Sequence, residues 1–106
     1  MIKVINGVKY YPVSERIRFG LESMRDHAYY KVECEWKELT QEQIDHYYNL
    51  IDECEKLLGS ITRDGFMAGK NYGRAKELTI AREYIRYNKC LEAGMSEREA
   101  SLCFSD

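Results

Sequence analysis

Apolar and polar positions alternate around a turn sequence in the first twelve residues, which predicts a β-hairpin. Apolar side chains dominate residues 2–5 and 8–11, and Asn6-Gly7 separates these two runs. An Asn-Gly pair accepts the positive φ angles that a two-residue type I′ turn requires. Pro12 then ends the second run. We therefore expect the chain to begin with two antiparallel strands.

The pattern changes twice after the hairpin. Ser14 can cap a helix that ends near Asp26, because apolar residues follow it at helical spacing. These residues are Ile17, Leu21 and Met24. From Tyr30 to Lys37 the period becomes two, which predicts a third strand with one buried face. The apolar positions of this strand are Tyr30, Val32, Cys34 and Trp36.

Two longer helical patterns occupy the second half of the chain. Thr40 and Gln43 form a capping box, so a helix is expected from Thr40 to Leu58, with Gly59 closing it. A further helix is expected from about Gly73 to Ala93. A second capping box predicts a short terminal helix that turns three residues toward the core. The box is Ser96 with Glu99, and the three residues are Ala100, Cys103 and Phe104.

These elements predict an α+β fold in the order ββαβααα, with a small antiparallel sheet packed on three to four helices. A chain of 106 residues with 44% hydrophobic content suits a single domain spanning residues 1–106. The net charge of -2 argues against a strongly basic nucleic-acid binder and against a heavily acidic DNA mimic. No apolar run approaches the length of a membrane span, so we expect a cytoplasmic protein with no membrane partner.

The residue types that carry most enzyme chemistry show no catalytic spacing. Four cysteines are present without a Cys-x-x-Cys pair, which predicts buried structural thiols and no metal site. For His27 and His46, surface or helix-packing roles are commoner than catalysis. Glu35 and Lys37, with Asp26 upstream, resemble a magnesium-binding arrangement of one nuclease family, but alternating charges are also typical of a half-exposed strand. We assign no catalytic, metal or cofactor residue and rank an enzyme below two binding functions.

Tyrosine is the first feature that indicates binding, with nine in the chain and three adjacent pairs. Neighbouring side chains of a strand point to opposite faces, so some of these rings are expected to be exposed. Tyr10, Tyr11 and Tyr29 are the predicted aromatic contacts, since exposed tyrosine suits protein interfaces and base stacking. The alternative is that their hydroxyls reach water at the rim of the core.

The second feature is the segment Gly59–Lys76, which combines repeated glycines with four basic residues and one acidic residue. Glycines let backbone amides approach an anion, and a following helix N-terminus adds its dipole. The spacing is not that of a P-loop. The segment is either a binding loop or an ordinary connection. Its predicted contacts are Arg63, Lys70, Tyr72 and Arg74.

Residues 5–17, Ile5-Asn6-Gly7-Val8-Lys9-Tyr10-Tyr11-Pro12-Val13-Ser14-Glu15-Arg16-Ile17, resemble the opening of phage Rad52-like single-strand annealing proteins. The short, tyrosine-rich and charge-rich chain is also similar in style to small bacteriophage accessory proteins, including inhibitors of host defences. These resemblances imply a non-catalytic binding protein whose partner is a host protein or complex. The alternative is a module that binds single-stranded nucleic acid or a nucleotide. A tyrosine-rich surface of modest charge is also compatible with a homodimer.

Overall fold

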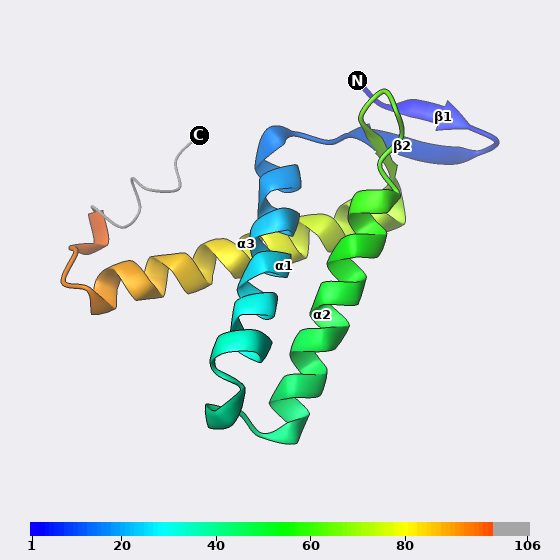
Figure 1. Ribbon diagram of the computed structural model, residues 1–106. Helices are drawn as coiled ribbons and strands as arrows, with labels where there is room; N and C mark the ends of the chain where they lie inside the picture. The colour runs from blue at the N-terminus through cyan, green and yellow to red at the C-terminus, as the bar shows by residue number, and fades with distance from the viewer. Residues whose placement is uncertain (99–106) are drawn as a thin grey trace.

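A β-hairpin opens the chain, and a strand from much later in the sequence completes its sheet (Figure 1). The computed structural model describes residues 1–98. Strands β1 (Lys3–Ile5) and β2 (Val8–Pro12) flank Asn6 and Gly7, whose φ angles are 51° and 79°. Both angles are positive, as a type I′ turn requires, so the predicted hairpin is confirmed.

Helix α1 (Glu15–Cys34) begins where the sequence predicts and runs well past the predicted end at Asp26. The Ser14 hydroxyl accepts a hydrogen bond of 3.3 Å from the backbone amide of Ile17, which caps the helix. The predicted strand at Tyr30–Lys37 is wrong, because α1 continues to Cys34 and a short 3₁₀ helix, η1 (Trp36–Glu38), follows.

A second apolar spacing explains why this segment is helical. Met24, Ala28 and Val32 recur every four residues along α1, and all three are buried. Ala28 and Val32 pack against Ile51 of the next long helix. That packing stabilises the segment as a helix. The alternation of period two does not correspond to a buried face in the structure.

Helix α2 (Gln41–Gly59) has the capping box that the sequence predicts. The Thr40 hydroxyl accepts a 3.2 Å hydrogen bond from the Gln43 amide, and the Gln43 side chain accepts a 2.9 Å hydrogen bond from the Thr40 amide. Helix α3 (Gly69–Glu92) starts four residues before the predicted Gly73. The predicted terminal helix falls largely on residues 99–106, which lie outside the described residues.

Strand β3 (Phe66–Ala68) lies within the Gly59–Lys76 segment, which the repeated glycines predict to be a loop. A turn at residues 62–65 precedes it, in which the Gly65 amide donates to the Thr62 carbonyl over 2.9 Å and Gly65 has a φ of 83°. The sheet order is β1-β2-β3, and both pairings are antiparallel. The α+β class and the three-stranded antiparallel sheet are therefore confirmed, with the third strand lying between α2 and α3.

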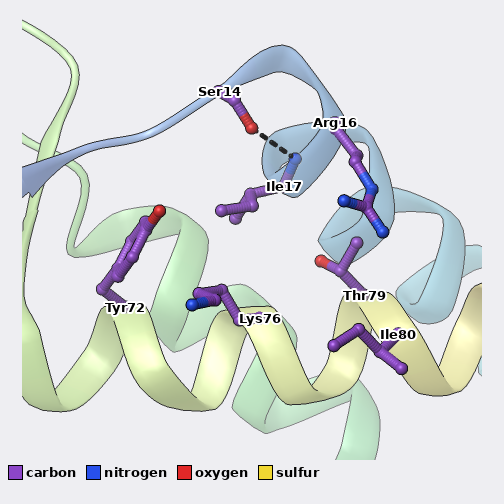
Figure 2. A pocket seen from close by; sticks show the side chains of 7 residues that line it. All are labelled: Ser14, Arg16, Ile17, Tyr72, Lys76, Thr79 and Ile80. Carbon is purple, nitrogen blue, oxygen red and sulfur yellow. Dashed lines mark hydrogen bonds between the residues drawn. The ribbon is translucent and has the colours of Figure 1, made fainter. Parts of the chain in front are cut away.

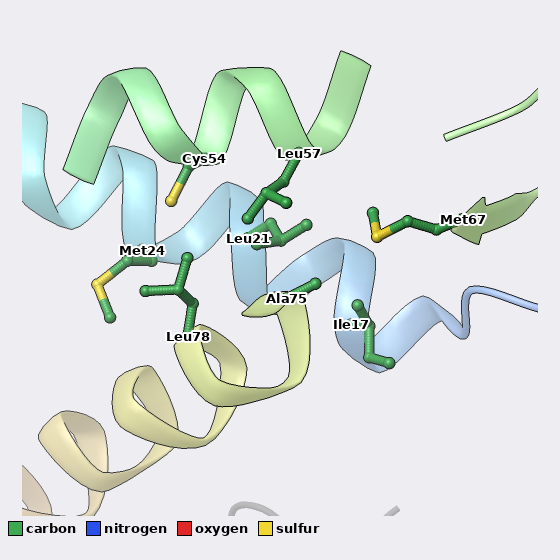
Figure 3. Packing of buried hydrophobic residues seen from close by; sticks show 8 residues of the cluster. All are labelled: Ile17, Leu21, Met24, Cys54, Leu57, Met67, Ala75 and Leu78. Carbon is green, nitrogen blue, oxygen red and sulfur yellow. The ribbon is translucent and has the colours of Figure 1, made fainter. Parts of the chain in front are cut away.

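The core lies where the three long helices meet one edge of this sheet. Figure 3 shows Leu21 of α1 among Leu57 of α2, Leu78 of α3 and Met67 of β3, and Leu21 and Met67 have no exposed surface. Helices α1 and α2 run side by side in opposite directions, and α3 crosses them (Figure 1). Gly20 of α1 marks the crossing, because its backbone lies directly against Thr79 of α3.

Candidate functional site

The two faces of the sheet differ in what covers them, and strand register determines which side chain lies on which face. Residues that pair directly across antiparallel strands share a face. Tyr11 pairs with Met67, and both lie on the face that packs on α3. The Tyr11 ring stacks on Tyr72 of α3, with centroids 5.0 Å apart and planes 8° from parallel. This face of the sheet is therefore joined to the helices.

The opposite face carries mostly apolar side chains, and none of them belongs to the core clusters of the described residues. We call it the open sheet face and define it by three cross-strand sets. These sets are Ile5 with Val8, Lys3 with Tyr10 and Ala68, and Pro12 with Phe66. Ile5 and Val8 are 50% and 46% exposed, and the hairpin projects beyond the helices (Figure 1). Apolar side chains that are exposed together on a sheet face are a feature of interaction surfaces.

One cation is fixed over the open sheet face. The Lys3 ammonium lies 4.3 Å from the centroid of the Phe66 ring and forms an ion pair with Asp64. Hydrogen bonds from Lys3 and from the Thr62 hydroxyl lower the pKa of the Asp64 carboxyl to about 2. The Thr62 hydroxyl also accepts from the Phe66 amide over 2.9 Å. This network ties the turn at residues 62–65 to the sheet and holds the Phe66 ring in place.

The fold places the predicted basic contacts in different surroundings. The Arg74 guanidinium donates two hydrogen bonds to Glu53 of α2, at 2.9 and 2.8 Å, and a third to Glu77 at 3.1 Å. These contacts raise the pKa of Arg74 and lower the pKa of Glu53, so the Arg74 charge is paired with two carboxylates at the protein surface. Arg63 lies exposed in the turn at residues 62–65, and Lys70 lies exposed in the first turn of α3.

Lys70 shares its surroundings with as many acidic as basic neighbours. It lines a pocket of 370 Å³ together with Asp52, Glu53, Lys56 and Arg74. Lys76 is also engaged, because its ammonium lies 5.5 Å from the centroid of the Tyr72 ring. The basic residues of the Gly59–Lys76 segment therefore do not form one continuous positive surface.

The predicted aromatic contacts are likewise separated. Tyr10 lies on the open sheet face, whereas Tyr11 and Tyr72 contact each other on the covered face. Tyr29 lies about 21 Å along α1 from its first residue, at the 1.5 Å rise per residue of an α-helix. Its hydroxyl donates to Glu55 of α2 over 3.1 Å, and this hydrogen bond raises the pKa of Tyr29. The structure therefore does not bring Tyr29 together with Tyr10 or Tyr11.

A pocket of 180 Å³ lies beside Tyr72, where the start of α1 meets α3. Figure 2 shows Tyr72 and Lys76 on α3 below the capping hydrogen bond of Ser14, with Arg16 of α1 near Thr79. The Arg16 side chain forms two hydrogen bonds to Glu83, at 2.6 and 2.7 Å. This volume is below the range of about 300–1,000 Å³ that is usual for small-molecule sites. The pocket is better explained as the seam between two helices.

Sequence reasoning missed a larger pocket of 410 Å³ between α1 and α3, which includes His27 and Arg82. A signal for it was available in the helical period of α3. Arg82 stands four residues after Leu78, which belongs to the core cluster, and three before Ile85, which packs against it. A charged residue within an apolar stripe indicates a buried polar site.

Comparisons of the chain with protein-family models, curated proteins and solved structures found no match. Within residues 1–98, no group of three His, Cys, Asp or Glu side chains is placed to hold a metal ion. None of the described helices has the length and apolar character needed to cross a membrane.

Proposed function

We propose that this protein is a small, non-catalytic binding protein that docks its open sheet face on a protein partner and blocks or modulates it. The resemblance of its first residues to phage proteins suggests a phage-encoded protein. Its partner would then be a bacterial host protein, such as a defence or nucleic-acid-processing enzyme. The open sheet face is the observation that carries this proposal.

The composition of the open sheet face favours a protein partner. Ile5, Val8, Pro12 and Phe66 supply apolar area, and Tyr10 adds a ring with a polar end. Such a combination of an apolar centre with tyrosine is typical of protein interfaces. The short strands are already fixed in register by the turn at Asn6-Gly7, so docking requires little ordering of the backbone.

The nucleic-acid alternative has less support from the same geometry. Phosphate recognition needs cations that are free to contact the backbone, and Arg74 is occupied by two carboxylates. Base stacking needs a free aromatic face, and one face each of Tyr11 and Tyr72 is used in their mutual stack. A protein partner therefore fits this surface better than single-stranded nucleic acid does.

The test compares two charge substitutions in the same strand on opposite faces of the sheet. Ile5→Lys places an ammonium on the open sheet face, and Val4→Lys places one on the other face. Both positions are exposed, at 50% and 65%, so both variants should fold. In affinity capture from bacterial extract, a partner retained by the wild type and by Val4→Lys should be lost from Ile5→Lys.

Three other outcomes are informative. Equal capture of the partner by both variants would remove the open sheet face from the interface. A wild-type dimer in sedimentation experiments that Ile5→Lys converts to monomer would identify a second copy as the occupant. Binding of a fluorescent single-stranded oligonucleotide that weakens steeply with salt would establish the nucleic-acid alternative instead.

A further inference from the structure

The pocket between α1 and α3 contains a partly buried arginine, Arg82, which forms no ion pair with a carboxylate among the residues that the structure describes. Its volume of 410 Å³ is within the usual range for small-molecule sites. The polar groups facing it from α1 include Ser23 and His27, and those from α3 are Arg82 and Lys89. This pocket is separate from the open sheet face and plays no part in the function proposed above.

Arg82 is held in place on one side of its guanidinium. Its Nε donates a 2.9 Å hydrogen bond to the Ser23 hydroxyl. Its Nη1 is buried, and no group among residues 1–98 accepts a hydrogen bond from it. A buried charged donor without an acceptor is costly, because it has lost water without replacing it.

Other arginines of the chain are paired with carboxylates. Arg16 is paired with Glu83, and Arg74 is paired with Glu53 and Glu77. No described carboxylate forms an ion pair with Arg82 or with Lys89. Burial lowers the pKa of Arg82, and the neighbouring Arg86 adds to this effect. The guanidinium nevertheless remains charged at neutral pH.

Several positive charges around the pocket contribute to a lowered pKa of His27. Burial, and after it the charges of Arg82, Lys89 and Lys31, lower the pKa of His27 to about 4, while Glu35 acts in the opposite direction. The imidazole is therefore neutral at pH 7 and keeps one N–H donor. Two carboxylates also line the pocket, and neither is among the main causes of the lowered His27 pKa. They are Glu22 and Asp26, and Asp26 lies 3.3 Å from Arg25.

We propose that this pocket binds a small organic oxyanion, a carboxylate or a phosphate monoester, through Arg82, Lys89 and Ser23. The Ser23 hydroxyl accepts from Arg82, so its own proton is available to donate to the anion. The guanidinium supplies a charge-assisted hydrogen bond, and Lys89 supplies a second positive charge. Phe19 and Tyr30 also line the pocket and offer aromatic surface to the body of the ligand.

Binding is tested with benzoate and phenyl phosphate, which share an aromatic ring and differ in the anion, and with inorganic phosphate and sulfate. Each is titrated against sodium chloride at equal ionic strength, and the His27 ring resonances are followed by NMR. A bound oxyanion should raise the His27 pKa from about 4 toward its ordinary value of 6.5. The tighter of the two aromatic probes identifies the anion class.

Three variants assign the effect to the pocket. Arg82→Gln should weaken binding by about 10-fold or more, the loss expected for a hydrogen bond to a charged group. Glu22→Gln should tighten it, because a competing carboxylate is removed. Arg63→Gln is the control, since that exposed arginine lies in the turn at residues 62–65 and should leave affinity unchanged.

Two results would overturn the proposal. One is the absence of saturable binding by all four anions together with an unmoved His27 pKa. The other is binding that Glu22→Gln and Arg82→Gln leave unchanged. If Arg82→Gln does not fold, the affinity of Glu22→Gln and the His27 titration of the wild type still test the proposal. Neither measurement depends on the Arg82→Gln variant.

Discussion

Replacing Gly20 by alanine should destabilise the protein, although alanine is the better helix former. A Cβ at position 20 would lie 2.4 Å from Oγ1, 2.6 Å from Cγ2 and 2.8 Å from Cβ of Thr79. Ordinary contacts between such atoms are about 3.5–4.0 Å, so the two helices would have to separate by about 1 Å. Gly20 is therefore required by the close crossing of α1 and α3.

The expected loss of stability in Gly20→Ala is the difference between two opposing contributions. Forcing an extra methyl into a packed core typically costs about 1–3 kcal/mol, and glycine to alanine in a helix returns about 1 kcal/mol. Thr79 cannot relieve the clash by rotation alone, because its hydroxyl donates a 2.8 Å hydrogen bond to the Ala75 carbonyl and its Cβ stays in place. We therefore expect a cost near the upper limit and a net loss of about 2 kcal/mol.

Chemical denaturation monitored by circular dichroism measures this loss directly. The matched control is Gly73→Ala in α3, where an added Cβ meets nothing within 4 Å and should stabilise by about 0.5–1 kcal/mol. Because both variants gain the same helix propensity, the gap of about 3 kcal/mol between them isolates the contact with Thr79. Thr79→Ala in the Gly20→Ala background should restore part of the stability. A Gly20→Ala protein as stable as Gly73→Ala would refute the close crossing of the helices.

Two further predictions concern buried titratable groups. The His27 pKa is about 4 in the folded protein and has its ordinary value of 6.5 in the unfolded chain, so unfolding takes up a proton between these values. The contribution of His27 to the free energy of unfolding should therefore be complete above about pH 6.5 and be lost as the pH falls toward 4. Over this range the wild type should lose at most about 3 kcal/mol more stability than His27→Gln. Parallel pH profiles of the two proteins would contradict this. Burial raises the pKa of the Cys54 thiol to about 11, whereas Cys34 is exposed. At pH 8 an alkylating reagent followed by peptide mass spectrometry should modify Cys34 well before Cys54, and equal rates would show that the core opens readily.

Local signals predicted the elements that depend on local chemistry. Asn6-Gly7 specifies its turn through φ angles, and Thr40 with Gln43 specifies a helix start through two reciprocal hydrogen bonds. Both predictions are confirmed because each depends on residues within a few positions of one another. The boundary of α3 was missed by four residues, because the glycines of this segment are typical of loops and helix α3 nevertheless includes Gly69 and Gly73.

The strand prediction at Tyr30–Lys37 failed because two periods coincide at Val32. The residue belongs both to an alternating set and to the four-residue spacing of Met24 and Ala28. Only packing against α2 decides between them, and in the structure Tyr30 and Trp36 of the alternating set are about half exposed. Strand β3 was missed for a related reason, since three residues are too few to show a period and their pairing with β2 is distant in sequence.

The candidate sites depend on α3 in a way that sequence spacing alone does not reveal. The first turns of α3 carry Tyr72 against the sheet, and the later turns carry Arg82 and Lys89 to the pocket beside α1. Thr79 lies between them, at the contact with Gly20. A change at Gly20 should therefore disturb both ends of α3, whereas Ile5→Lys and Arg82→Gln each act at one end. Loss of partner capture without loss of oxyanion binding, and the reverse, would show that the two surfaces are independent sites on one helical frame.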